Sequence, residues 1–358
     1  GIAARVVAAE GKTHVTISTD LGGDDDPPTL ELWKFLNQIT RKPFTGAEPV
    51  SRLSLETTLT STECSSPKMD VKQCGAVGDG VADDTAAIQK ALAGGRRLVV
   101  IPPGTYKVSA ALKVDSDTTI KADAKAVIRL ADGAGTNAGV FLLTNRDPER
   151  GNTNITVEGG IWDGNNVHNP RGREGDPNGY TGAALNFVNV RHLVLRNLTV
   201  RNPEAFSIRF GEVEDFVVEG ILFDHAVIRP NQDGVHVCGF CRRGVIRNVR
   251  ALTPRTTNDD MVALNADNDP DRVINLGMKR GPIRDITVEN LRAHSAYTFV
   301  RLLSHEQPIE NITISGVVGG CRMHAVNLGR WRFPAGGGNI HNVTLRDFTV
   351  HKVASGKK

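Results

Sequence analysis

The sequence is poor in features that define several large classes of protein. Its 358 residues include only three Trp, three Tyr and four Met. No run of 18 apolar residues occurs, so we expect no transmembrane helix and no membrane partner. Basic residues number 43 and acidic residues 40, and a net charge of +3 is too small to favour nucleic acid as a partner. No secretory signal is recognisable, and Gly1 is the start expected of a processed or truncated chain.

Cysteine is also sparse, with five residues in the whole chain: Cys64, Cys74, Cys238, Cys241 and Cys321. An odd set of five allows at most two disulfides, and no two paired motifs with zinc-ligand spacing occur. Cys238 and Cys241 form a Cys-x-x-Cys motif, but no βαβ pattern surrounds it. We therefore predict structural thiols or a local disulfide rather than a redox or zinc site.

The remaining composition, 39% hydrophobic and 23% charged with 37 glycines, is that of a soluble globular protein with many tight turns. Residues 1–66 lack clear periodicity and are predicted to be an N-terminal extension or strap. Within it, residues 30–39 are compatible with a short amphipathic helix. Asp20, Asp24, Asp25 and Asp26 are interpreted as a solvated loop. Residues 67–358 are predicted to form one catalytic domain.

Regular organisation begins at Met69 with a strand, a Gly-rich turn and a helix that has Asp83, Asp84 or Thr85 as its N-cap. The apolar pattern that follows directly favours capping over catalysis for the two aspartates. The segment GDGVADDTAAIQKAL, followed by PPGTY, resembles the N-terminal signature of pectate-lyase-like parallel β-helices. In that superfamily this helix plugs the open end of the coil.

A strand unit recurs from residue 150 onwards, as in NITVEGG, HLVLRNLTV and DITVENL. Its repeated apolar positions are Val157, Leu195, Val218, Ile246, Val288, Ile314 and Leu345. A constant unit at irregular spacing is typical of a solenoid whose coils carry loops of variable length. A doubly wound α/β fold needs a helix between strands, and these intervals contain none. We predict an all-β fold, a single-stranded right-handed parallel β-helix with an N-terminal capping helix.

A second set of strands lies between these units, and its alternate side chains are expected to point outwards. The outward candidates are Asn186, Arg209, His236, Asn265, Arg301 and Asn327. Asp233 and the Asp259–Asp260 pair stand at strand starts in this set. Trp162, Tyr180, Tyr297 and Trp331 lie in nearby loops, so the pattern favours an extended carbohydrate cleft over an ordinary solvated sheet face.

The motif Asn231-Gln232-Asp233-Gly, followed by Asp259-Asp260 and the strand Val-Ala-Leu-Asn, resembles glycoside hydrolase family 28, the polygalacturonase group. Arg301 matches the arginine of that family's Arg-Ile-Lys motif. The resemblance implies Asp260 as general acid, with Asp233 and Asp259 holding and deprotonating the water. Substrate-binding residues are then expected at Asn231, Arg209, His236, Asn265, Arg301, Asn186 and Asn327.

Two departures from the family pattern concern substrate recognition. No Gly-His-Gly follows Asp260, and Leu303 stands where the family has the lysine of Arg-Ile-Lys. His236, His294 and His305 are candidates to replace the missing histidine. Contacts to an acidic sugar are available from Arg209, Arg301, Arg330 and Arg332.

The leading hypothesis is an inverting glycoside hydrolase that acts as a monomer on an acidic, pectin-like polysaccharide or oligosaccharide, without metal or cofactor. We expect it to be secreted or periplasmic. The second hypothesis is a polysaccharide lyase with a cation such as calcium and with Arg301 or Lys279 as base. Its cation ligands would be Asp259, Asp260, Asp267, Asp269 and Asp271. The third is a non-catalytic glycan-binding solenoid.

Overall fold

The computed structural model describes residues 67–171, 180–251, 253–269, 272–275, 277–328 and 338–354. The predicted extension at residues 1–66 lies outside the described residues, as do Asp271, Arg330, Trp331 and Arg332. Within the described ranges, no helix has the length and apolar character needed to cross a membrane.

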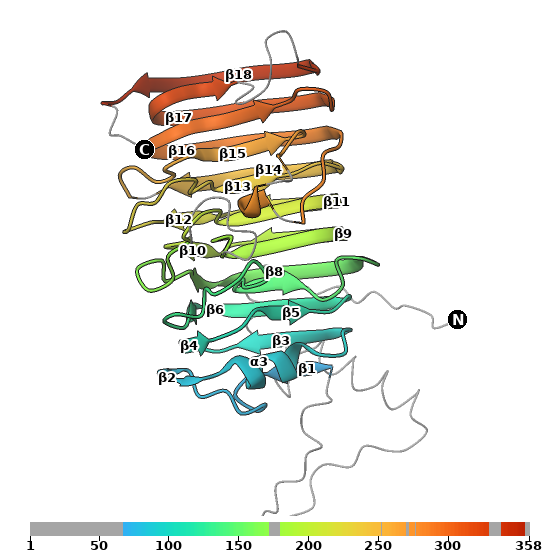
Figure 1. The fold of residues 1–358 in the computed structure, drawn as a ribbon, viewed down its shortest axis with the longest axis vertical. Coiled ribbons are helices and arrows are strands. Elements are labelled where there is room, and N and C mark those ends of the chain that lie inside the picture. The colour runs from blue at the N-terminus through green and yellow to red at the C-terminus, as the bar shows by residue number, and fades with distance from the viewer. Residues whose placement is uncertain are drawn as a thin grey trace, which may run out of the picture. The chain divides into compact units, whose positions relative to one another are not determined.

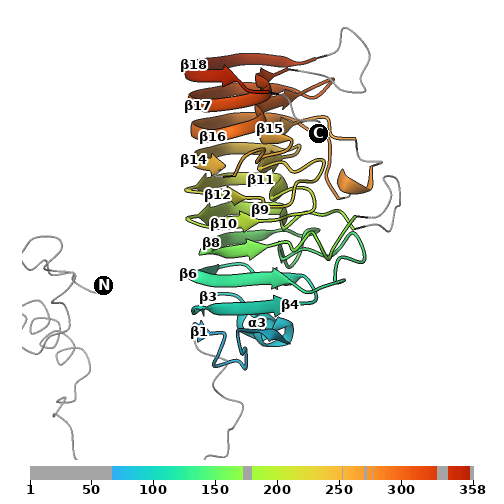
Figure 2. The same ribbon diagram turned by 90° about the vertical axis from the view of Figure 1, so that its left-hand side faces the viewer.

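The described residues form a right-handed parallel β-helix, as the repeat pattern predicted. Figures 1 and 2 show its coils stacked in chain order, from β1 at one end to β18 at the other. Its strands are β1 (Lys68–Asp70), β2 (Asp79–Asp83), β3 (Arg97–Ile101), β4 (Gly104–Val108), β5 (Leu112–Val114), β6 (Thr118–Leu130), β7 (Leu143–Asn145), β8 (Asn152–Asp163), β9 (Leu185–Arg196), β10 (Thr199–Arg201), β11 (Ile208–Glu219), β12 (Leu222–Asp224), β13 (Val235–Val237), β14 (Cys241–Ala251), β15 (Asp260–Asn265), β16 (Ile283–Leu303), β17 (Ile309–Asn327) and β18 (Ile340–Lys352).

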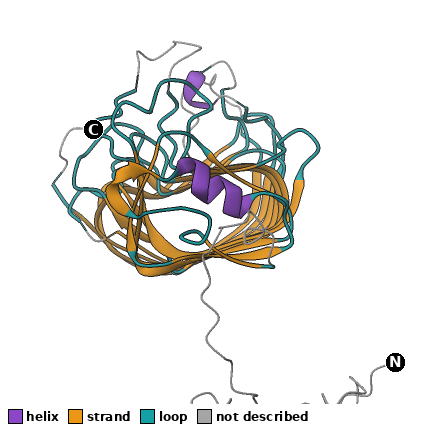
Figure 3. Cartoon of the chain, turned by 90° about the horizontal axis from the view of Figure 1, so that it is seen from below, coloured by secondary structure: helices purple, strands orange, loops and turns teal. Residues whose placement is uncertain are grey.

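The predicted capping helix is α3 (Thr85–Leu92), which buries Ile88, Ala91 and Leu92 against the first coils. Viewed along the stack, α3 lies across the end of the coil (Figure 3). Asp84 occupies the N-cap position without a side-chain cap. Its carboxylate instead accepts hydrogen bonds from the backbone N–H groups of Val77 and Gly78, at 2.6 and 3.1 Å. The aspartate therefore fixes the Gly-rich turn to the helix start.

The repeated apolar positions predicted from the sequence are stacked in a single register. Val157 pairs with Leu195, Leu195 with Val218 and Val218 with Ile246. The series continues in the same register through the last three positions: Val288, Ile314 and Leu345. All but the terminal Leu345 are buried. Stacking of identical positions thus builds one continuous core through the coils.

The strand column that carries the site runs through β9, β11, β13, β15, β16 and β17. Asn186, Arg209, His236, Arg301 and Asn327 occupy equivalent positions on successive strands, with Ala263 between His236 and Arg301. Asn265, also predicted to point outwards, lies two residues further along β15 and pairs with Leu303, whereas Ala263 is the residue beside His236.

Cys238, Cys241 and Cys321 are buried free thiols, whereas Cys74 is disulfide-bonded. The Cys-x-x-Cys motif therefore forms no local disulfide, and its cysteines serve as structural thiols. Burial raises the pKa of Cys241. A buried, protonated thiol is a poor nucleophile, in agreement with the absence of a redox motif context in the sequence.

Candidate active site

The three aspartates of the two motifs are brought together where two coils stack. Asp233 lies just before β13, and Asp260 is the first residue of β15. The backbone N–H of Asp260 donates to Asp233 Oδ1 at 3.1 Å, and that of Gly234 donates to the Asp260 carbonyl at 2.9 Å. A Cβ on Gly234 would lie 2.4 Å from the Met261 carbonyl oxygen. A glycine after Asp233 therefore permits the close approach of the two coils.

Asp233, Asp259 and Asp260 form a compact carboxylate cluster. One oxygen from each can be chosen so that all lie within 4.8 Å of one another. The three residues are only 3–5% exposed. Among the described residues this is the group whose geometry fits a metal ion, and carboxylate oxygens are the ligands that calcium prefers. The same closeness suits activation of a water molecule.

Two basic side chains contact the carboxylate cluster. Arg301 Nη1 lies 3.8 Å from Asp260 Oδ2, and both side chains are largely buried. His236 Nδ1 lies 2.5 Å from Asp233 Oδ2, and its ring packs on Phe206 with centroids 4.4 Å apart. On its other side, His236 Nε2 lies 3.3 Å from Asn268 Oδ1. The cluster is thus flanked by a guanidinium and by an imidazole that is fixed on both sides.

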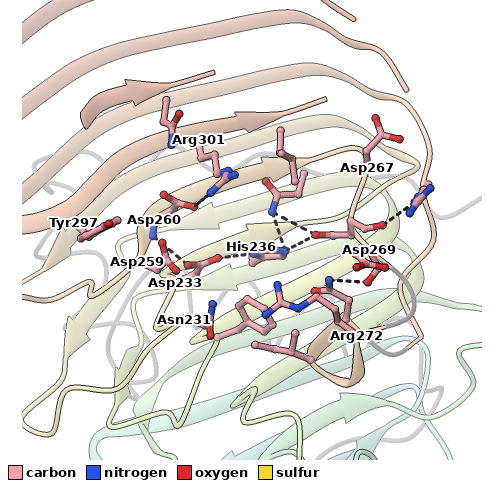
Figure 4. A pocket seen from close by; sticks show the side chains of 18 of the residues that line it. Asn231, Asp233, His236, Asp259, Asp260, Asp267, Asp269, Arg272, Tyr297 and Arg301 are labelled. Atoms are coloured by element: carbon pink, nitrogen blue, oxygen red, sulfur yellow. Dashed lines mark hydrogen bonds and ion pairs between the residues drawn. The ribbon is translucent and has the colours of Figure 1, made fainter. Parts of the chain in front are cut away.

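These residues line a cavity of about 740 Å³, which lies within the usual range for ligand pockets. Figure 4 shows the labelled aspartates, His236 and Arg301 facing this space, with Tyr297 beside Asp259 and Asp260. The lining also includes Asp267, Asn268, Asp269, Arg272, Ile274, Asn275, Arg280, Leu303 and His324. The cavity therefore has a carboxylate-rich part and a part rich in amides and guanidinium groups.

Eight of the ten residues predicted for the site line the cavity: Asn231, Asp233, His236, Asp259, Asp260, Asn265, Arg301 and Asn327. Arg209 and Asn186 do not. Arg209 is fully buried, where Nε donates to Asn186 Oδ1 at 2.8 Å and Nη1 donates to the carbonyl of Ile274. Burial lowers the pKa of Arg209 to about 10. The loop around Ile274 covers this arginine, so the outward direction of its strand position does not expose it.

The alternative residues weighed in the sequence are also separated by the structure. Of the three candidate histidines only His236 lines the cavity, whereas His294 and His305 do not. Lys279, a candidate lyase base, is absent from the lining and pairs with Glu212 at 2.8 Å. Asp267 lines the cavity, but its Oδ2 accepts three backbone N–H bonds at 2.7–3.0 Å from the turn at residues 305–307.

Several lining residues were not predicted from the sequence. Most lie on the loop between β15 and β16, which contains the 3₁₀ turn η2 (Val273–Asn275). In this loop only Lys279 and the aspartates were considered, as lyase residues. Its arginines, Arg272 and Arg280, were overlooked, as were Phe206 and His324. Basic residues inside the segment that replaces a lost motif were the available signal.

The loop that carries Asp259 is held by a buried arginine from β17. Arg322 Nε donates to the Ser295 carbonyl at 3.2 Å, and Nη2 donates to Asn258 Oδ1 at 2.8 Å. Its guanidinium also lies 5.2 Å from the Tyr297 ring centroid. Burial lowers the pKa of Arg322, whereas Asp259 acts to raise it. The arginine thus joins three coils behind the carboxylate cluster.

A second set of contacts joins the two aspartate loops to each other. Asn258 Nδ2 donates to the Arg229 carbonyl at 3.0 Å, and the Asp259 N–H donates to the Gln232 carbonyl at 3.3 Å. Arg229 is in turn paired with the buried Glu204 at 3.0 Å. Burial raises the pKa of Glu204. These contacts fix the spacing of Asp233 and Asp259 before any ligand binds.

Comparison with known families finds a match over the N-terminal coils. Residues 69–170 match the family described as "Rhamnogalacturonase A/epimerase, pectate lyase-like". This segment ends before the first of the three aspartates. It therefore confirms the type of β-helix and carries no information on the site.

Related proteins differ in kind. The chain is 38% identical over 109 residues to the "Pre-neck appendage protein" of Bacillus phage phi29, covering 30% of this chain and 12% of that protein. It is 21% identical over 304 residues to "Polygalacturonase" of Persea americana, covering 81% and 61%. It is 30% identical over 217 residues to a "Mannuronan C5-epimerase" of Azotobacter vinelandii, covering 50% and 21%. The chain thus spans less than two thirds of each of these relatives.

Among solved structures, a "Family 28 Exopolygalacturonase" of Yersinia enterocolitica superposes with a TM-score of 0.59 at 17% identity. The superposition covers 81% of this chain and 66% of that one. Together with the matched family, this confirms the expectation of a parallel β-helix of the polygalacturonase-like kind. At this identity the likeness concerns the fold.

Proposed function

We propose that this polygalacturonase-like β-helix is a glycoside hydrolase that cleaves an acidic, pectin-type polysaccharide. The observation that carries the proposal is the cluster of Asp233, Asp259 and Asp260, whose oxygens lie within 4.8 Å inside a 740 Å³ cavity. Hydrolysis of a glycosidic bond needs one carboxyl group to protonate the leaving oxygen and a carboxylate to activate water. The similarity to polygalacturonases supports this chemistry.

Each carboxylate of the cluster has a basic neighbour. Arg301 Nη1 lies 3.8 Å from Asp260 Oδ2, and His236 Nδ1 lies 2.5 Å from Asp233 Oδ2. Asp259 interacts with the guanidinium of Arg322, whose pKa it acts to raise. We therefore keep the roles that the family resemblance implied, with Asp260 as proton donor and with Asp233 and Asp259 holding and deprotonating the water.

We keep inversion as the proposed stereochemical outcome, on the strength of the resemblance. Inverting enzymes usually have carboxyl groups about 6.5–9.5 Å apart, and retaining enzymes about 5–5.5 Å. The 4.8 Å bound applies to one chosen oxygen from each carboxylate and is shorter than the usual inverting distance. The anomer first released is therefore the quantity to measure.

A lyase remains the second candidate because the same three carboxylates fit a cation. Its base would be Arg301, which lines the cavity, rather than Lys279, which is paired with Glu212. Calcium would then serve as its cofactor, whereas the hydrolase needs none. A lyase reaction leaves an unsaturated uronate and stops when a chelator removes the cation.

Substrate and location complete the proposal. The partner is a polysaccharide or oligosaccharide, and the chain works as a monomer, without nucleic acid. A secreted or periplasmic location is supported by the disulfide at Cys74, because disulfides persist in oxidising compartments.

The test is incubation of the full chain with pectic, alginate and other acidic polysaccharides, with and without chelator. The proposal expects new reducing ends, saturated products and no effect of chelation. Unsaturated, chelator-sensitive products would establish the lyase. A change at C5 without chain cleavage would indicate epimerisation, as in the mannuronan-acting relative. Binding without any reaction would establish the glycan-binding solenoid.

A further inference from the structure

The cavity lacks the lysine that the family resemblance places two residues after Arg301, on the same strand. Leu303 stands at that position, where it pairs with Asn265 and lines the cavity. A leucine cannot bind a carboxylate. The neighbouring Arg301 already lies 3.8 Å from Asp260. Recognition of an acidic sugar therefore needs another cation in this cavity.

The loop between β15 and β16 supplies two arginines to the same cavity, Arg272 and Arg280. In Figure 4, Arg272 lies below His236, on the side of the cavity away from Asp260 and Arg301. Arg280 Nε donates to the Asn268 carbonyl at 3.0 Å. Among the described residues, the Arg280 side chain makes this one hydrogen bond, and no described carboxylate forms an ion pair with it. The two terminal nitrogens of Arg280 can thus receive a bidentate carboxylate.

The described residues of the loop, 266–269, 272–275 and 277–282, are held by several contacts. Buried Arg209 donates to the Ile274 carbonyl from beneath, and Asn275 Nδ2 donates to the Asp269 carbonyl at 2.9 Å. The Gly281 N–H donates to the Ala266 carbonyl at 2.9 Å, and Met278 is buried. These contacts hold both ends and the middle of the loop. A guanidinium carried on such a loop is preorganised, which reduces the ordering cost of binding.

A chain of contacts relates Arg280 to the catalytic cluster. The Asn268 carbonyl accepts a hydrogen bond from Arg280 Nε, and Asn268 Oδ1 lies 3.3 Å from His236 Nε2. His236 Nδ1 in turn lies 2.5 Å from Asp233 Oδ2. Arg280 is therefore separated from the carboxylates by His236 and Asn268. A saccharide with its bond at the aspartates would extend along the cavity towards this arginine.

We propose that Arg280 forms a carboxylate subsite for a uronate unit next to the bond that is cleaved. The loop thus supplies a positive charge in place of the family's lysine, whose position on β16 is occupied by Leu303. The inference rests on the proposed function for the position of the cleaved bond. The subsite itself is tested by binding, independently of cleavage.

The experiment measures binding by calorimetry at low ionic strength, using trimers of galacturonate and of mannuronate and the methyl ester of each. The proteins are the full wild-type chain, Arg280→Gln and Lys279→Gln. Lys279→Gln is the matched control, because it removes the same charge at the neighbouring position. The Lys279 side chain lies outside the cavity lining, is 65% exposed and is paired with Glu212. Thermal melting confirms that each variant is folded.

We expect wild type to bind at least one free acid more tightly than its ester. Arg280→Gln should weaken binding of that acid by about tenfold or more, as for loss of a hydrogen bond to a charged group, with little change for the ester. Lys279→Gln should match wild type. The inference is overturned if Arg280→Gln binds the acid normally, if both variants lose affinity equally, or if wild type does not prefer an acid.

Cleavage is recorded separately, so that the two proposals can fail separately. Arg280-dependent binding of the acid without release of reducing ends would contradict the hydrolase and leave the subsite standing. Cleavage of an acidic polymer with the same KM in wild type and Arg280→Gln would contradict the subsite alone.

Discussion

His236 Nδ1 and Asp233 Oδ2 lie 2.5 Å apart, and both side chains are buried at the edge of the catalytic cavity. At this distance Nδ1 and the carboxylate oxygen are hydrogen-bond partners. The imidazole therefore orients the carboxylate that we assign to water activation. This histidine comes from the same strand column as the site, rather than from a motif after Asp260.

Replacement of this histidine tests that role. His236→Gln should lower kcat by about 10–100-fold, the effect expected for loss of a hydrogen bond to a charged group, and should shift the pH profile of kcat. His294→Gln, a matched change outside the cavity lining, should leave both unchanged. An unaltered pH profile in His236→Gln would remove His236 from the mechanism.

Arg322 is predicted to position Asp259 through the loop that it holds. Arg322→Ala should lower kcat more than it raises KM, because the hydrogen bonds to Asn258 and to the Ser295 carbonyl are lost. Its free energy of unfolding should fall by about 2 kcal/mol or more. Added guanidinium ion should restore part of kcat, whereas urea at the same concentration should not. Equal effects of the two solutes would indicate a purely structural role.

The proton-donor assignment is tested by the leaving group of the substrate. An aryl glycoside with a good leaving group needs little protonation, so loss of the acid matters less for it. Asp260→Asn should therefore recover activity on such a substrate relative to the polysaccharide. Asp259→Asn should remain impaired on both. The opposite pattern would give the acid role to Asp259.

Stability at low pH is predicted to depend on the buried His225. Burial lowers its pKa to about 3 from 6.5, and its Nε2 lies 3.1 Å from Ser207 Oγ. Between these two pKa values the unfolded chain binds a proton that the folded chain does not, so stability falls as pH is lowered through this range. The loss between pH 7 and pH 4 is about 3 kcal/mol, from about 1.4 kcal/mol per pKa unit. Urea unfolding of His225→Gln should show a correspondingly weaker pH dependence, and parallel curves would refute this account.

Much of the fold followed from the sequence because a solenoid repeats local information. Val157, Leu195 and Val218 occupy one stacked register, as their strand units indicated. Asp233 and Asp260 met because coils stack at a fixed spacing. The rest depended on contacts that no period encodes. The repeat pattern did not predict that Ala263 lies beside His236 and that Asn265 lies two residues further along β15.

Long-range coverage also could not be predicted. The sequence predicted that the Arg209 side chain points outwards from its strand. Its burial comes from the loop around Ile274, which is 65 residues away in the sequence. The cavity took much of its polar lining from the loop after β15, in which only Lys279 and the aspartates had been considered from the sequence. Arg280 belongs to this loop. Such segments show no alternation, and their side chains are placed by tertiary contacts.

The most direct test of the central claim is a proton NMR time course of an acidic pectic polysaccharide with wild type and Asp260→Asn. The account predicts that wild type releases saturated reducing ends whose first-formed anomer is inverted. It predicts that Asp260→Asn, folded as judged by melting, is slower by about 100-fold or more. Full activity of Asp260→Asn on the substrate that wild type cleaves would contradict the account.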